Sequence, residues 1–130
     1  MYKTGVTLSR RAAIVIIVDC STSMKKYTMF NGMRIVKAEA AEFITNMLID
    51  ELYERAIRYD VTRYYYDIAI IGFSGDGTYS KLPGIHDFVP IYNFTDFEPQ
   101  PKTYYFDQTL NDGRCIKVPF VIRPWIKAEA

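Results

Sequence analysis

The chain has 130 residues, and 49% of them are hydrophobic, which suits a single domain with one packed core and excludes a largely disordered chain. Sixteen basic and fifteen acidic side chains give a formal net charge of +1, so the chain offers no strong field to attract nucleic acid or an anionic membrane. The longest apolar run is far shorter than the ~20 residues that a membrane span needs.

Cysteine usage and the N-terminal segment indicate a cytoplasmic protein. Cys20 and Cys115 are far apart in the sequence and form no C-x-x-C pair, so we expect neither a disulfide nor a zinc site. Residues 1–11 contain no apolar region of the kind that a signal peptide has.

The first half of the chain predicts a strand, a helix and a second strand. Residues 12–18 are continuously apolar and rich in β-branched side chains, which is typical of a strand buried on both faces of a sheet. Residues 24–30 predict a loop, and Asn31 is a suitable N-cap for a helix over 32–58. Residues 66–73 predict a second buried strand, parallel to the first in a right-handed βαβ unit. The apolar stripe of the helix recurs every three or four residues, at Val36, Ala40, Phe43, Ile44, Met47, Leu48, Leu52 and Ala56.

The second half of the chain predicts shorter elements. Residues 74–77, Ser-Gly-Asp-Gly, are typical of a turn, and the proline-containing run 88–94 predicts an edge strand. Residues 103–106 and 115–122 flank an Asn-Asp-Gly turn and predict a C-terminal hairpin. Residues 123–130 predict no regular element.

Three oxygen-bearing side chains, Asp19, Ser21 and Ser23, follow the first strand at alternate positions. Ligands of open α/β sheets bind beyond the carboxyl ends of the strands, and alternate side chains of a turn can converge on one point there. One carboxylate and two hydroxyls are hard donors that suit Mg²⁺ or Mn²⁺ rather than Zn²⁺. The alternative is that these side chains cap free backbone amides at a helix start without any metal.

Residues 19–23, Asp-Cys-Ser-Thr-Ser, match a D-x-S-x-S motif. Together with the apolar strand before them, the helix after them and the Gly-Phe-Ser end of the next strand at 72–74, they make the segment 11–95 resemble the von Willebrand factor type A domain. The resemblance implies a Rossmann-like, three-layer α/β fold with a metal-ion-dependent adhesion site. In such a site Asp19, Ser21 and Ser23 hold Mg²⁺ or Mn²⁺, directly or through water, and a carboxylate of a protein partner completes the coordination. The implied function is metal-dependent protein binding, not catalysis.

The chain departs from this family after its first site loop. The family has a second loop with a metal-coordinating threonine and a third with an aspartate, and neither is identifiable here. Thr95 and Asp96 follow an apolar run, but they come before any loop that could supply the threonine. We therefore expect residues 1–130 to form a single, incomplete von Willebrand factor A-like domain, made of a βαβ core, an edge strand and a C-terminal hairpin. With two loops missing, we expect metal binding to be weak or lost.

Truncation leaves the first strand with an unpaired, apolar edge. The corresponding strand of the family is central, with the second strand on one side and a later strand on the other. An open edge invites pairing with another chain, so we expect a homo-oligomer unless the C-terminal hairpin covers this edge. A metal-free structural or assembly fragment that self-associates through its sheet edge is therefore the alternative function.

An enzyme is a further alternative. A strand ending in aspartate also occurs in Mg²⁺-dependent phosphatases that use an aspartyl nucleophile. That chemistry needs a second carboxylate two residues later, where this chain has Ser21, so we expect no catalysis. Ser74 and Asp76 are expected in a turn rather than a ligand loop, and His86, the single histidine, is expected at the surface.

Overall fold

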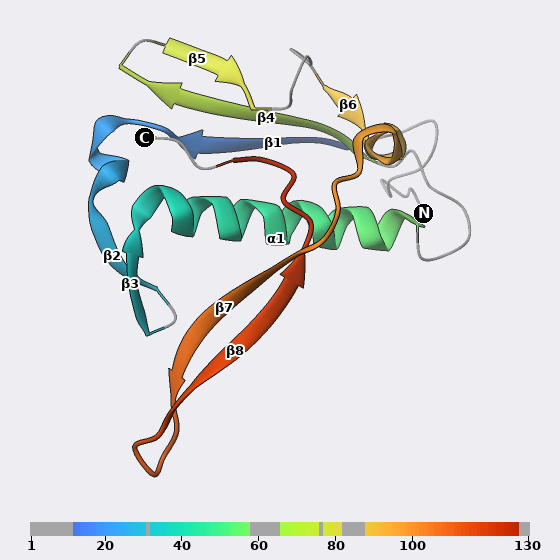
Figure 1. Cartoon of the computed structure of the whole chain (residues 1–130). Coiled ribbons are helices and arrows are strands. Elements are labelled where there is room, and N and C mark those ends of the chain that lie inside the picture. Colours follow the sequence, from blue (N-terminus) through green and yellow to red (C-terminus); the bar gives the residue numbers. More distant parts are fainter. Residues whose placement is uncertain (1–11, 31, 58–65, 76, 82–87, 128–130) are drawn as a thin grey trace, which may run out of the picture.

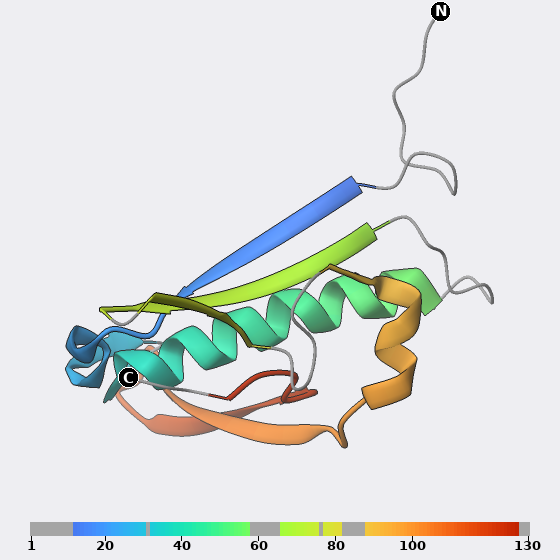
Figure 2. The ribbon, with the colours of Figure 1, turned by 90° about the horizontal axis from the view of Figure 1, so that it is seen from above.

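The computed structural model describes residues 12–30, 32–57, 66–75, 77–81 and 88–127. These residues form a mixed α/β structure, which confirms the predicted class. Seen from above, a four-stranded sheet, one long helix and a separate β-hairpin lie in successive layers (Figure 2). The helix is thus the middle layer of the described structure, with β-structure on both sides of it.

The larger sheet is built around two parallel strands (Figure 1). Strand β1 (Ala12–Asp19) pairs in parallel with β4 (Tyr66–Ser74) over its whole length, which confirms both predicted strands and their relative direction. On the other edge of β4 lie two short antiparallel strands, β5 (Gly77–Ser80) and β6 (Val89–Pro90). The pairing of Ser74 with Gly77 confirms the predicted turn between β4 and β5.

Strand β1 is an edge strand, because β4 is its only partner among the described strands. Ile14 and Ile16 pack against the core, whereas Val15 and Ile17 are 45% and 65% exposed. The prediction of a strand buried on both faces is therefore wrong, since helix α1 covers one face and the outward side chains of β1 remain exposed. The predicted unpaired apolar edge is confirmed for the described residues, and the C-terminal hairpin does not pair with it.

A small hairpin replaces the predicted loop and the predicted first turns of the helix. The chain passes through the 3₁₀ helix η1 (Thr22–Lys25) into β2 (Tyr27–Phe30) and β3 (Met33–Val36), which pair antiparallel. The prediction of a loop over 24–30 and of a helix from residue 32 is wrong here. The pair Asn-Gly at 31–32 is a strong signal for a two-residue hairpin turn, and Gly32 has a φ of +79°, which an L side chain rarely adopts.

Helix α1 (Lys37–Ile57) crosses between the two β-layers. Of the predicted stripe, Ala40, Phe43 and Ala56 are buried and Leu52 packs partly against the core, while Val36 belongs to β3. The remaining three predicted core residues are exposed, because neither β-layer extends over that side of the helix: Ile44, Met47 and Leu48. A helix buried on two opposite sides does not show the single apolar stripe on which the prediction relied.

The C-terminal hairpin agrees with the prediction. Strands β7 (Lys102–Thr109) and β8 (Cys115–Ile122) pair antiparallel around a turn in which Gly113 has a φ of +89°. The edge strand predicted over 88–94 is shortened to β6, and the 3₁₀ helix η2 (Ile91–Phe97) follows at once.

Two apolar clusters hold the layers together. The larger joins α1 to the inner face of the sheet, and the smaller joins Phe43 of α1 to Phe106 and Ile122 of the hairpin. The segment after β8, for which no element was predicted, completes the larger cluster: Trp125 and Ile126 are buried, and Asn46 exchanges two hydrogen bonds with the backbone of Ile126. These bonds satisfy a buried amide that would otherwise destabilise the helix.

Ion pairs of Arg123, the residue after β8, hold the end of the C-terminal hairpin in place. The Arg123 guanidinium binds Asp50 at 2.8 Å and also Glu54, both on α1, and Glu98 at 3.0 Å. Tyr53 of α1 donates a hydrogen bond to Glu98. This hydrogen bond is the main cause that lowers the pKa of Glu98; burial opposes it, and Arg123 contributes in the same direction as Tyr53.

Replacing Tyr53 by phenylalanine should make stability less dependent on acid pH. Because the pKa of Glu98 in the folded state is below its ordinary value of 4.5, its contribution is present above that pH and is lost as the pH falls through the folded-state pKa. Without the tyrosine hydroxyl the pKa rises towards the ordinary value, and the variant loses about 0.5–1 kcal/mol at neutral pH after allowance for solvent screening. Urea unfolding from neutral pH to about pH 3 measures the difference. Equal pH slopes for the two proteins would contradict this role, and Glu98→Gln is the control that removes the titrating group.

Candidate functional site

The three predicted site residues lie where β1 ends and turns away from the sheet. Asp19 is paired with Phe73 of β4, and the Cys20 N–H donates to the Phe73 carbonyl at 2.8 Å. This bond fixes the chain at the carboxyl end of the two parallel strands. The turn of η1 then begins, with the Met24 N–H donating to the Ser21 carbonyl at 3.0 Å.

Asp19, Ser21 and Ser23 are connected through Ser21. The backbone N–H of Ser21 donates to Oδ1 of Asp19 at 2.8 Å, and the hydroxyl oxygens of Ser21 and Ser23 lie 2.9 Å apart in a hydrogen bond. The three residues therefore belong to one hydrogen-bonded turn. The sequence predicted this grouping from the alternate spacing.

Electrostatics favour the charged form of Asp19. Hydrogen bonding from Ser21, first by its side chain and then by its backbone N–H, lowers the pKa of the carboxyl group, and the positive charge of Lys37 at the start of α1 adds to the effect. A carboxylate that stays ionised at neutral pH is available to a cation. It also shows that Asp19 has a local role without a metal, because it accepts a bond from the turn that follows it.

The alternative that these side chains cap a helix without any metal explains only part of the structure. Ser21 occupies the N-cap position of η1, but its side chain makes no capping hydrogen bond. Helix α1 begins at Lys37, so none of the three side chains lies at its N-terminus. The serine hydroxyls are thus not used for helix capping, and Asp19 alone satisfies a backbone donor.

The donor chemistry fits Mg²⁺ or Mn²⁺ bound with several waters. These ions take oxygen ligands, and Mg²⁺ in particular keeps much of its hydration shell when it binds one or two carboxylates. The Asp19 cluster supplies one carboxylate, which accepts from the Ser21 backbone, and two serine hydroxyls within hydrogen-bond distance of each other. Within the described ranges, no group of three or more His, Cys, Asp and Glu side chains could hold a metal ion, so a site at Asp19 would depend on the serines.

Of the other residues considered from the sequence, the two in η2 do not join this cluster. Thr95 and Asp96 lie in η2, which follows β6 and therefore lies by the amino end of β4, at the opposite end of the sheet from Asp19 (Figure 1). Ser74 lies at the same end as Asp19, next to Phe73. Asp76 and His86 lie outside the described residues. Cys20 and Cys115 are free thiols, as expected.

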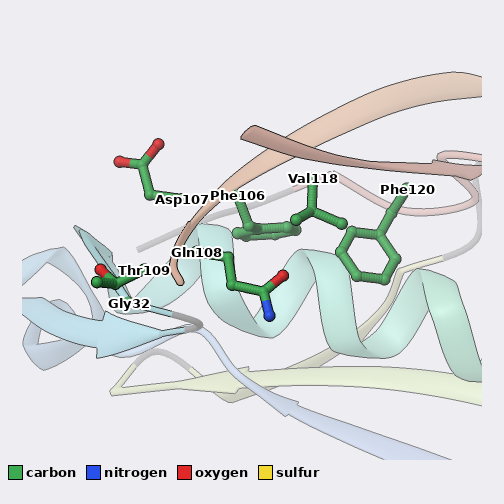
Figure 3. Close-up of a pocket in the computed structure, with 7 residues that line it drawn as sticks. All are labelled: Gly32, Phe106, Asp107, Gln108, Thr109, Val118 and Phe120. Atoms are coloured by element: carbon green, nitrogen blue, oxygen red, sulfur yellow. The ribbon is translucent and has the colours of Figure 1, made fainter. Parts of the chain in front are cut away.

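A pocket that the sequence did not indicate lies between the C-terminal hairpin and the turn at Gly32. It has a volume of about 430 Å³. Phe106, Val118 and Phe120 project from the hairpin to the side where α1 lies, whereas Asp107 points away (Figure 3). Asp107, which also lines the pocket, is paired with Lys117 at 2.6 Å. The alternation of apolar residues in β7 and β8 is the signal that could have revealed it.

The Asp19 cluster is therefore the described site with the clearest chemistry. No helix in the described part of the chain is both long and apolar enough to cross a membrane. No protein-family model matches this sequence, and no curated protein or solved structure is significantly similar to it.

Proposed function

We propose that this chain is a von Willebrand factor A-like, metal-dependent protein-binding module. Asp19, Ser21 and Ser23 would hold Mg²⁺ or Mn²⁺, and a carboxylate of the protein partner would complete the coordination. The proposal includes a non-catalytic role and a cytoplasmic location, which the free thiols of Cys20 and Cys115 support.

One observation carries this proposal: a carboxylate and two hydroxyls are grouped at the carboxyl end of β1, beside a parallel strand reached through a helix. The family resemblance predicts the same grouping at the same place. The turn holds the donors before any ligand arrives, so binding need not first order them. The cation would supply positive charge for a carboxylate that could not otherwise approach Asp19.

Magnesium should raise the melting temperature of the protein, and Asp19→Ala should abolish the rise. A ligand that binds only the folded state stabilises it by about 2.7 kcal/mol at a hundredfold excess over its dissociation constant, and removal of the carboxylate removes the only charged donor of the cluster. Differential scanning fluorimetry with increasing MgCl₂ or MnCl₂, reversed by EDTA, measures this effect.

Asp96→Ala is the matched control, because Asp96 is an exposed aspartate at the other end of the sheet. It should leave the magnesium response unchanged. Equal melting of the unaltered protein in EDTA and in magnesium would overturn the proposed function.

A metal-free assembly module is the second candidate, and the open edge of β1 favours it. Among the described strands only β4 pairs with β1, and Val15, Ile17 and the neighbouring Phe73 are exposed. A strand edge exposes unpaired backbone donors and acceptors that another strand can satisfy. A stable dimer whose melting is the same in EDTA and in magnesium would select this function over the first.

A further inference from the structure

Along the chain, the hairpin β2–β3 lies between the Asp19 cluster and helix α1. It begins directly after η1, and the Lys37 N–H, at the first residue after β3, donates to the Lys26 carbonyl at 2.8 Å. Lys37 also acts electrostatically on Asp19. The open end of the hairpin is therefore tied to the candidate metal site, and both views show the segment after β1 lying next to β2 and β3 (Figures 1 and 2).

The two faces of this hairpin have different surroundings. Phe30 and Met33 pack against the small apolar cluster that joins α1 to the C-terminal hairpin. Tyr27 and Met29, which alternate with the inward residues, are 55% and 68% exposed. Arg34 is paired with Met29 across the hairpin, and its guanidinium lies 4.3 Å from the centre of the Tyr27 ring. The outer face thus combines two large apolar side chains with an arginine.

The charged side chains of this segment of the chain have one sign. From residue 20 to residue 37 the chain has four basic and no acidic side chains, namely Lys25, Lys26, Arg34 and Lys37. A groove of about 370 Å³ is lined by Lys26, Tyr27, Thr28, Met29 and Arg34, again without an acidic residue. In a chain whose total charge is nearly balanced, this concentration favours an acidic occupant over a second copy or an apolar ligand.

We propose that the outer face of β2–β3 is the second half of the partner-binding surface, and that the partner is an acidic segment carrying at least one large apolar side chain. One carboxylate of the segment would reach the metal at Asp19, which rests on the proposed function. Its next carboxylates would pair with Arg34 and Lys26, and its apolar side chain would lie on Tyr27 and Met29. The hairpin would then determine which acidic segments the metal site accepts.

A fluorescein-labelled peptide, Glu-Asp-Phe-Glu-Asp-Leu, tests this surface by fluorescence anisotropy in magnesium and in EDTA. Arg34→Glu should weaken peptide binding about tenfold, because an attraction becomes a repulsion at an exposed position. The matched control is Arg55→Glu, since Arg55 is exposed in the last turn of α1, at the other end of the helix, and its pair with Glu51 is a surface pair. The same peptide with serine in place of phenylalanine and leucine should bind about tenfold more weakly.

The possible outcomes distinguish the role of the hairpin surface from the role of the metal in binding. Magnesium-dependent binding that falls in Arg34→Glu and not in Arg55→Glu supports the surface. Equal effects of the two reversals, or no peptide binding although magnesium still raises the melting temperature, would overturn the surface and leave the proposed function intact. Binding that needs Arg34 but is indifferent to EDTA would support the hairpin surface and overturn the metal-dependent function.

Discussion

Replacing Trp125 by alanine should lower the free energy of unfolding by about 3–5 kcal/mol, as the removal of a buried aromatic side chain does in other proteins. The indole is buried, and its ring lies 5.0 Å from that of Tyr53 and 5.4 Å from that of Phe94. Its Nε1–H also donates to Asp50 at 3.2 Å. The substitution therefore opens a cavity between α1 and η2 and leaves a polar group of the helix with fewer partners.

Urea or thermal unfolding followed by circular dichroism measures this loss. Val121→Ala is the control from the same region, because Val121 is 63% exposed and should change stability by less than about 0.5 kcal/mol. Similar stabilities of the two variants would show that the segment after β8 does not belong to the core. Trp125→Phe should fall between them, since it keeps an aromatic ring and loses the hydrogen bond.

The sequence could predict elements whose signals are local. The β-branched runs at β1 and β4 and the Asn-Asp-Gly turn between β7 and β8 each specify their structure within a few residues, and all are found where they were expected. The hairpin at residues 27–36 had an equally local signal, an Asn-Gly pair. It was missed because the apolar spacing of the following helix was extended backwards through Gly32.

Burial was less predictable because it depends on what packs from elsewhere in the chain. Asn46 is fully buried although it is polar, since the backbone of Ile126 satisfies its amide from eighty residues away. Ile44 and Leu48 are apolar and exposed, since no layer reaches them. Likewise, no pattern near Arg123 reveals that three acidic side chains from two other segments surround it.

The placement of the candidate site residues on one turn was predictable for the same reason that the strands were. Asp19, Ser21 and Ser23 belong to one turn, so their spacing alone brought them together, and the contacts among them agree with that expectation. A complete family site would require donors from later loops, whose positions depend on distant parts of a fold. The described structure brings no such donor from η2, because Thr95 and Asp96 lie at the wrong end of the sheet. Among the donors identified in the described residues, a metal here would draw on this single turn, with water completing its coordination.

Replacing Ile17 by lysine should raise the dissociation constant of a dimer formed through β1 by about a hundredfold. The backbone edge of β1 is unpaired in the described structure, and residues 12–18 contain no charged side chain to discourage pairing with a second β1. In a two-fold symmetric dimer the substitution would place two lysines close to the shared pair of β1 strands. If each lysine weakens association by about 1.4 kcal/mol, the dissociation constant rises tenfold for each and about a hundredfold in total. Because the Ile17 side chain is 65% exposed, the fold of the protomer should be unaffected.

Sedimentation velocity over a range of protein concentrations measures this change. Val121→Lys is the matched control, because it places the same charge at a similarly exposed apolar position on β8, away from the edge of β1. It should leave association unchanged. A clean monomer at high concentration for the unaltered protein would contradict association through this edge, as would equal effects of the two lysines. If instead Ile17→Lys alone dissociates the dimer while magnesium still raises its melting temperature, the sheet edge assembles the protein and the Asp19 turn remains free at the end of each β1 to bind its partner.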